Sequence, residues 1–245
     1  MPTPPPGTIL DAHVHTVRGA ADSELQPADL LDRARIRGLT GLNVTEHDRV
    51  WERPEWDAFR AQAPDLFISQ GMEVSTDLGH IIVFGIDQYY PGIRSCERLR
   101  EVADEIGAFI TVAHPFRHFF DPVTFLRKGE PPFSMTPQEA AERMRVFQVV
   151  HGIEVGNGAN TLRENAFAYR VAQILGKPMT GGSDAHSTSG IGAYATGFPE
   201  PLTSREQMLA HLHAGRTTPY VGNETGLHIF QPDPPPNDTD DAPAG

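Results

Sequence analysis

The stretch Asp11-Ala12-His13-Val14-His15 follows the first apolar run of the chain, Thr8-Ile9-Leu10. In a β-strand, side chains two positions apart point to the same face, so His13 and His15 would lie side by side with Asp11 below them. Two imidazoles held in this way can bind one divalent metal ion through ring nitrogens. A His-X-His pair is common by chance, so the prediction depends on matching ligands at the ends of other strands.

Segments typical of strands and helices alternate from residue 8 onward. Strands are expected at residues 8–13, 39–45, 66–74, 80–86, 108–113, 152–155, 178–181, 194–198 and 217–221. Helices are expected at residues 27–38, 54–63, 95–106, 136–147, 161–176 and 203–215. This alternation predicts a parallel sheet, and the first strand is not followed by a Gly-X-Gly-X-X-Gly loop. The pattern therefore favours an α/β barrel over a doubly wound sheet.

Two connections depart from this simple alternation. Only residues 75–79 separate the strands expected at 66–74 and 80–86, so this pair is expected to form a hairpin or an extension. The aromatic-rich connection at residues 116–133 is long for a compact domain, which is typical of a functional loop.

Length and composition indicate one soluble domain. The chain has 245 residues, of which 39% are hydrophobic and 21% charged, and we expect one barrel over residues 8–230. A flexible Pro-rich arm (1–7) and a disordered, acidic Pro-rich tail (231–245) are expected to flank it. The single cysteine, Cys96, fits a reducing cytoplasm, and neither a secretory signal nor a membrane span is expected.

The net charge of −12, from 20 Lys and Arg against 32 Asp and Glu, limits the partners of the chain. Proteins that bind long nucleic acids usually show a basic surface, because neutralising phosphates drives their affinity. We therefore expect no long nucleic acid as a partner, and with no long apolar run in the sequence we expect no membrane partner either. A small phosphorylated substrate remains compatible with this charge, and the oligomeric state stays open.

Histidines and carboxylates gather where the predicted strands end, and His80 follows a short turn. The C-terminal ends of barrel strands are where such folds build their active sites. These residues are His13, His15, Glu46, His47, Asp48, Glu73, His80, His114, Glu154, Asp184 and His186. Imidazole and carboxylate ligands without a thiolate favour zinc, manganese or iron. A carboxylate such as Glu73 can also bridge two cations, which suits metal-assisted hydrolysis.

At this point the sequence resembles the polymerase and histidinol phosphatase (PHP) family, whose motifs read DxHxH, TDHD, GxE with a later His, AHP and SDAH. The matching segments are Asp11-Ala12-His13-Val14-His15, Thr45-Glu46-His47-Asp48, Gly71-Met72-Glu73 with His80, Ala113-His114-Pro115, and Ser183-Asp184-Ala185-His186. The resemblance implies a distorted (β/α)7 barrel that holds two or three divalent metal ions.

The resemblance also implies a ligand set. The first metal ion would be bound by His13, His15, Glu73 and Asp184. The second would share Glu73 and add His80 and His114. The third would use His47, His186 and an acidic residue soon after His15, for which Asp22 is the candidate.

The sequence departs from the family pattern at two positions. The family ligand after the His-X-His pair usually falls five or six residues beyond the second histidine, whereas Asp22 falls seven beyond His15. The third metal ion would then need a longer loop or a different ligand. Glu46 stands where the family usually has Asp, and its side chain need not be a ligand.

Three further residues have open roles. Arg117 and Arg18 could each bind a substrate phosphate or be ordinary loop arginines. Glu154 could line the pocket or orient a ligand from behind.

The function implied by the family is hydrolysis of a small phosphomonoester, of histidinol-phosphate or nucleotide type, by a metal-activated hydroxide. Glu73, Asp184 and His186 are the catalytic candidates: Glu73 bridges the ions, and Asp184 or a metal-bound histidine manages protons, with the general acid left open. An amidohydrolase-like enzyme that cleaves C–N or C–O bonds is disfavoured, because neither Lys128 nor Lys177 ends a strand. A non-catalytic metal-binding module is the remaining alternative.

Overall fold

The computed structural model describes residues 7–129 and 131–233. The predicted arm (1–7) and tail (231–245) lie outside the described residues, apart from Gly7 and residues 231–233. Within the described ranges, no helix combines the length and the apolar character that a membrane span requires.

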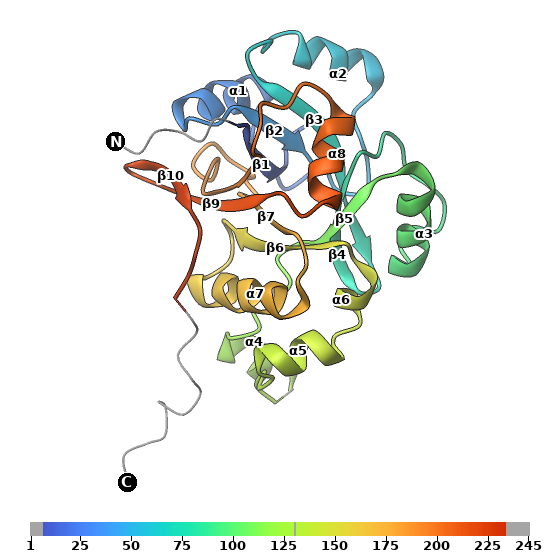
Figure 1. The fold of residues 1–245 in the computed structure, drawn as a ribbon, viewed down its shortest axis with the longest axis vertical. Coiled ribbons are helices and arrows are strands. Elements are labelled where there is room, and N and C mark those ends of the chain that lie inside the picture. Colours follow the sequence, from blue (N-terminus) through green and yellow to red (C-terminus); the bar gives the residue numbers. More distant parts are fainter. Residues whose placement is uncertain (1–6, 130, 234–245) are drawn as a thin grey trace.

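The centre of the fold is one curled sheet of ten strands with helices around it (Figure 1). The strands are β1 (Ile9–Val14), β2 (Gly41–Val44), β3 (Phe67–Thr76), β4 (Gly79–Phe84), β5 (Phe109–Val112), β6 (Gly152–Asn157), β7 (Met179–Gly182), β8 (Tyr194–Gly197), β9 (Thr218–Asn223) and β10 (Gly226–Ile229). Their order across the sheet is β10-β9-β8-β1-β2-β3-β4-β5-β6-β7. The sheet forms a curled half-barrel in a mixed α/β fold.

The expected (β/α)7 barrel is therefore confirmed only in part. β4 runs antiparallel to both β3 and β5, and β8 runs antiparallel to β1. Among the described residues β1 and β7 form no ladder, and an isolated parallel bridge joins Val14 of β1 to Ala185, just after β7. The predicted hairpin is confirmed, since β3 ends at Thr76 and β4 begins at Gly79, too close for the helix that a parallel crossover needs.

The helices lie on the outside of the curl (Figure 1). They are α1 (Pro27–Ile36), α2 (Arg53–Arg60), α3 (Cys96–Ile106), α4 (Pro122–Lys128), α5 (Pro137–Arg143), α6 (Val146–Val149), α7 (Leu162–Leu175) and α8 (Arg205–His213). Helices α5 and α7 each begin with a capping box, in which Thr136 and Thr161 are bonded reciprocally to the glutamate three residues later.

The sequence missed three local features. The helix expected at residues 136–147 is interrupted at Met144, whose ψ of 112° is extended, and resumes as α6. The connection expected at residues 116–133 contains α4. The expected last strand is followed by β10, because Gly226 with its φ of 118° allows the tight reversal.

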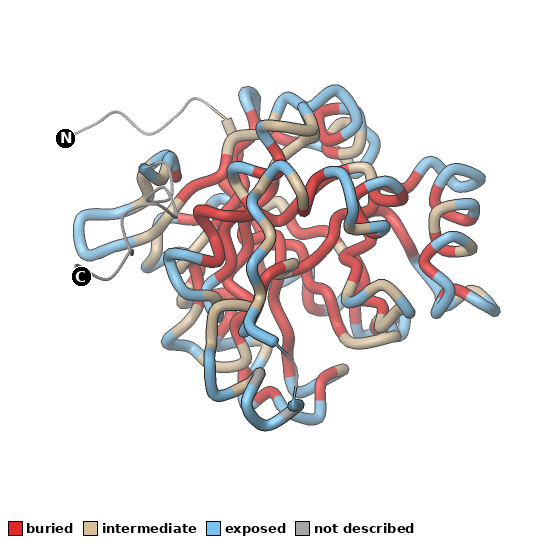
Figure 2. Tube along the Cα trace, turned by 90° about the horizontal axis from the view of Figure 1, so that it is seen from below, coloured by how far each residue is buried: buried red, intermediate tan, exposed pale blue. Residues whose placement is uncertain are grey.

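Buried residues gather in the middle of the fold, and exposed residues lie at its periphery (Figure 2). One apolar cluster packs α8, through Met208 and Leu212, against Leu10 and Phe109 near the starts of β1 and β5. The apolar contacts thereby fill the end where the parallel strands begin. The end where those strands finish is left to polar side chains.

Candidate metal centre

Two histidines of β1 and its continuation form the most deeply buried part of the centre. The Nε2 atoms of His13 and His15 lie 2.9 Å apart, and neither side chain is exposed. Asp184 Oδ1 lies 3.4 Å from the first nitrogen and 3.3 Å from the second. Glu73 Oε2 lies 3.5 and 3.2 Å from the same two atoms. We call these four residues the inner group.

Backbone contacts between β1 and the chain after β7 bring Asp184 to these histidines. The Asp184 N–H donates to the carbonyl oxygen of His13 at 2.7 Å, and the His15 N–H donates to that of Ala185 at 3.1 Å. Gly182 permits this approach, because a Cβ there would lie 2.4 Å from the Cβ of His13. Asp184 itself has a φ of 54°, in the left-handed region that few non-glycine residues adopt.

Asp11 reinforces the same junction without contacting the imidazoles. Its two oxygens accept the backbone N–H groups of Ser183 at 2.8 Å and Gly192 at 3.0 Å. Burial raises the pKa of Asp11 to about 6, although these hydrogen bonds act in the opposite direction. Asp11 therefore fastens the loop that carries Asp184 to β1.

A second group forms on the other side of Glu73. Glu73 Oε1 lies 3.0 Å from His80 Nδ1 and 3.0 Å from His114 Nε2. His80 comes from β4 and His114 from the end of β5, where its φ of 31° is again in the left-handed region. Because Oε1 faces this second group while Oε2 faces the inner group, one carboxylate joins the two.

The outer group consists of Asp22, His47 and His186. Asp22 Oδ1 lies 3.7 Å from His47 Nε2, and Asp22 Oδ2 lies 3.5 Å from His186 Nε2. His47 Nδ1 also lies 2.9 Å from Glu73 Oε2, which connects the outer group to the inner one. The ring of His15 stacks on those of His47 and His186 at 4.2 and 4.5 Å. The loop after His15 thus does bring Asp22 to these histidines, despite its spacing.

The carboxylates and imidazoles of the cluster shift one another's pKa toward the charged form. Burial disfavours ionisation of Glu73, but the surrounding imidazoles, His13 first, outweigh it and hold its pKa well below the usual value. Burial likewise opposes the charge on His13, but Asp184, Glu154 and Glu73 raise its pKa well above the usual value. The hydrogen bond to Glu73 raises the pKa of His80. The carboxylates are therefore in the ionised form that binds cations.

The donor set fits divalent metal ions. Three sets of three side chains each offer donor atoms within 4.8 Å of one another: His13, His15 and Asp184; Glu73, His80 and His114; and His15, His47 and His186. Glu73 Oε2 is buried and makes no hydrogen bond of good geometry with any described residue, although His47 Nδ1 lies 2.9 Å away. An unsatisfied buried acceptor is costly, and a bound cation would satisfy it.

Residues behind the ligands form a polar network. Glu154 Oε1 lies 3.0 Å from His13 Nδ1, so Glu154 lies behind a ligand rather than at the pocket wall. Arg117 forms an ion pair with Asp184 Oδ2 and donates to the side-chain oxygens of Asn157 at 2.8 Å and Asn160 at 3.2 Å. Sequence reasoning missed both asparagines, although Asn157 ends β6 and the same strand-end rule applies to it.

Two other predicted positions lie to the side of the cluster. Arg18 pairs with Glu55 of α2 at 3.2 Å, and both side chains are about half exposed. Glu46 is buried and accepts hydrogen bonds from Thr16 Oγ1 at 2.5 Å and Trp51 Nε1 at 2.7 Å. Its longer side chain is thus used to fix the loop after β1.

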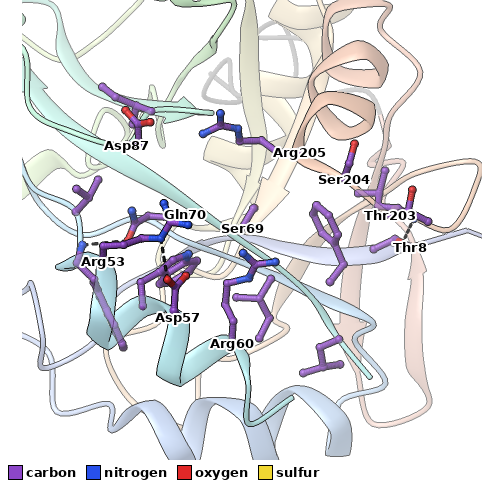
Figure 3. A pocket seen from close by; sticks show the side chains of 18 of the residues that line it. Thr8, Arg53, Asp57, Arg60, Ser69, Gln70, Asp87, Thr203, Ser204 and Arg205 are labelled. Carbon is purple, nitrogen blue, oxygen red and sulfur yellow. Dashed lines mark hydrogen bonds and ion pairs between the residues drawn. The ribbon is translucent and has the colours of Figure 1, made fainter. Parts of the chain in front are cut away.

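A separate hollow of about 1690 Å³ lies on the outer side of β3, between α2 and α8 (Figure 3). Arg60 and Arg205 point into it from these two helices. Among the described residues that line it, none belongs to the metal centre.

Comparison with known proteins places this geometry in context. Residues 163–217, which carry Ser183-Asp184-Ala185-His186, match the PHP-associated family model. The PHP resemblance is confirmed. A 3′,5′-nucleoside bisphosphate phosphatase from Chromobacterium violaceum is 33% identical over 113 residues, which cover 42% of this chain and 39% of that relative. The matched part thus spans about two fifths of the relative.

Solved structures share the fold of this chain at lower identity. PsfC from Pseudomonas syringae is 20% identical with a TM-score of 0.54, over 83% of this chain and 88% of PsfC. A protein of Bifidobacterium adolescentis, provisionally described as a metal-dependent phosphoesterase, is 17% identical with a TM-score of 0.51, over 74% and 89%. A C. violaceum amidohydrolase solved with sulfate and no metal is 19% identical with a TM-score of 0.54, over 73% and 87%.

Proposed function

We propose that this chain is a metal-dependent phosphoesterase that hydrolyses a small phosphomonoester at a centre of two or three metal ions. The observation that carries the proposal is the position of Glu73. Its two oxygens face different sets of imidazoles, with Oε1 toward His80 and His114 and Oε2 toward His13, His15 and His47. A carboxylate in this position can bridge two cations, the arrangement that suits in-line displacement at phosphorus.

The residues divide the work in the proposed reaction. His13, His15, Glu73 and Asp184 would hold the first ion, His80 and His114 the second with Glu73, and Asp22, His47 and His186 the third. Bound divalent ions supply Lewis-acid polarisation of a phosphoryl oxygen and lower the pKa of a coordinated water. Asp184 and His186, which face the same space, would accept or return a proton. In this proposal the scaffold is a distorted (β/α)7 barrel whose open end lies at this centre.

Arg117 is the best placed side chain for a substrate phosphate. Its guanidinium lies at the centre, about a quarter exposed, and is held by Asp184, Asn157 and Asn160. A guanidinium oriented in this way can offer paired N–H donors to a phosphate. Arg18 is a weaker proposal, because it pairs with Glu55 at the surface.

A small substrate fits the charge of the chain. With a net charge of −12, the protein repels long polyanions, whereas a single phosphate can be drawn to a centre rich in imidazoles and cations. The name of the C. violaceum relative supports a nucleotide-type substrate, and a histidinol-phosphate type is the other possibility. Zinc, manganese and iron are the metals that these ligands favour.

Hydrolysis assays on metal-defined protein test the proposal. The protein is stripped with a chelator, reloaded with Zn²⁺, Mn²⁺ or Fe²⁺, and assayed with p-nitrophenyl phosphate, nucleotides and histidinol phosphate. We expect activity only after reloading, and loss of activity in a folded His13→Ala variant. Full activity in the stripped protein would overturn the metal-dependent mechanism. Metal binding without hydrolysis of any phosphoester would favour a non-catalytic module.

An amidohydrolase reaction is less well supported. Lysines that bridge metals in such enzymes must reach the ions, but Lys177 Nζ donates to the carbonyl oxygen of Val150 at 2.6 Å, before the start of β6. The side chain of Lys128 lies outside the described residues. Glu73 occupies the bridging position instead. Cleavage of an amide substrate by the reloaded protein would reverse this preference.

A further inference from the structure

We propose that Glu154 is a positioning residue that fixes the tautomer of His13 and links two of the ligand groups. The inference rests on the metal centre of the proposed function. Glu154 lies in β6 and is 1% exposed. Its Oε1 lies 3.0 Å from His13 Nδ1, and its Oε2 accepts the backbone N–H of His114 at 2.8 Å and the Asn157 Nδ2–H at 2.9 Å.

The neighbours of Glu154 require a carboxylate. The His114 backbone and the Asn157 amide nitrogen are both donors, and they share Oε2. The remaining oxygen, Oε1, faces the ring of His13, where an ionised carboxylate can only accept a hydrogen bond. The neutral ring of His13 therefore carries its proton on Nδ1.

This tautomer leaves the lone pair of His13 Nε2 available to bind a metal ion. His13 Nε2 is the nitrogen that faces His15, Glu73 and Asp184 in the inner group. With the proton on Nδ1, Nε2 presents a lone pair to that space. Hydrogen bonds from the other ring nitrogen to a carboxylate also orient the ring and increase its basicity as a ligand.

The carboxylate of Glu154 also contacts a residue of the second group. Its contact with the His114 N–H helps hold His114 at a φ of 31°, from which the ring meets Glu73 Oε1 in the second group. Asn157, the other donor to Glu154, accepts from Arg117, and Arg117 pairs with Asp184. Glu154 thus contacts ligands of both groups while belonging to neither.

The isosteric variant Glu154→Gln separates this role from simple packing. An amide keeps the shape of the side chain but has only one acceptor oxygen. If the oxygen stays with His114 and Asn157, the amide NH₂ faces His13 Nδ1 and favours the tautomer protonated on Nε2, which cannot bind metal. If the amide flips, its NH₂ meets the donors of His114 and Asn157.

Zinc affinity measures the effect. The chelator-stripped variant and wild type are titrated with Zn²⁺ against a chromophoric competitor, and bound zinc is counted by mass spectrometry. We expect a 10- to 100-fold weaker affinity in Glu154→Gln, roughly the cost of removing such a partner. Glu164→Gln is the matched control, since Glu164 is also buried and accepts backbone N–H groups, from His118 at 2.6 Å and Thr161 at 2.8 Å. It should bind zinc as the wild type does.

The tautomer itself is read from ¹⁵N NMR of the imidazoles in the stripped wild type at a pH where His13 is neutral. We expect the His13 proton on Nδ1, with the signal assigned through its absence in His13→Asn. A proton on Nε2 would overturn the inference even if Glu154→Gln failed to fold. Equal zinc affinity in Glu154→Gln and wild type would also overturn it. A wild type that binds no zinc contradicts the proposed function instead, and leaves the tautomer result as a separate test.

Discussion

The inner and outer groups of the centre are built differently. In the inner group, the donor atoms of His13, His15 and Asp184 lie within 3.4 Å of one another, and these side chains are at most 3% exposed. In the outer group, Asp22 lies 3.5–3.7 Å from its histidines, which are 29% exposed, and its own side chain is 67% exposed. Sheet pairing and buried hydrogen bonds fix the inner ligands, whereas a surface loop supplies Asp22.

From this difference we infer that the two groups bind ions with different affinities. Ligands that are already held in place lose little entropy on binding an ion, so the inner group and its bridging Glu73 should bind most tightly. The outer group needs the loop around Asp22 to be ordered, and should bind a third ion more weakly. The metal-binding predictions below test this comparison.

The largest effect is expected for Glu73→Gln. The amide keeps the volume but cannot bridge two cations, and it leaves the surrounding imidazoles without their shared negative charge. We expect phosphoester hydrolysis to fall on the order of 10³-fold, equivalent to several kcal/mol of metal-assisted stabilisation. Activity and zinc content are measured together. Retention of two tightly bound ions with near wild-type turnover would show that Glu73 is not the essential bridging ligand.

Paired substitutions compare the two groups directly. Asp184→Asn should lower zinc affinity and turnover by about 100-fold, and Asp22→Asn by about 10-fold or less, both within the range for altered metal sites. The measurements are competition titration and initial rates at fixed metal concentration. A larger loss in Asp22→Asn than in Asp184→Asn would reverse the proposed ranking of the groups.

Stepwise metal removal tests the same ranking without mutation. Dialysis of the loaded protein against increasing chelator should release the ion of the outer group first, while the inner ions persist to higher chelator concentrations. Bound metal is counted after each step by mass spectrometry. Release of all ions in a single step would show that the groups bind as one unit.

The smallest effect concerns His151, which precedes β6 at the opposite end of the strands. Burial, with help from the charges of Arg100 and His213, lowers its pKa from 6.5 to about 4, whereas the carboxylates around His13 raise the pKa of that residue. The unfolded chain therefore binds an extra proton between pH 6.5 and 4. His151 contributes stability that is present above pH 6.5 and is lost as the pH falls toward 4.

His151→Asn checks this sign. The Asn oxygen can replace Nδ1 as acceptor for the Ile110 N–H, which lies 3.1 Å away, but it does not titrate. In urea unfolding of stripped protein from pH 7 to 5, the free energy of unfolding should fall less steeply in the variant, by up to about 1.4 kcal/mol per pH unit. Identical slopes would contradict the lowered pKa.

The sequence predicted the centre because its ligands follow a simple rule of position. His13, His47, Glu73, His114 and Asp184 each lie at or just beyond the end of a parallel strand or within β3, and the fold brings those ends together. The hairpin was predictable as well, because five intervening residues cannot hold a crossover helix.

Other features depend on geometry that spacing does not encode. The extent of closure depends on a single bridge from Val14 to Ala185, and the antiparallel strands β8–β10 resemble other short apolar runs in sequence. The role of Glu154 depends on which donors surround it. The ion pair between Arg117 and Asp184 could not be predicted without the fold. The approach of Asp22 likewise depends on the path of its loop.

Anomalous diffraction from crystals of the zinc-loaded protein tests the central claim most directly. The account predicts at least two anomalous peaks, both next to Glu73, with one about 2.0–2.1 Å from the Nε2 atoms of His13 and His15. A third, weaker peak is expected between His47 and His186. Zinc peaks confined to other parts of the surface, with none beside Glu73, would contradict it.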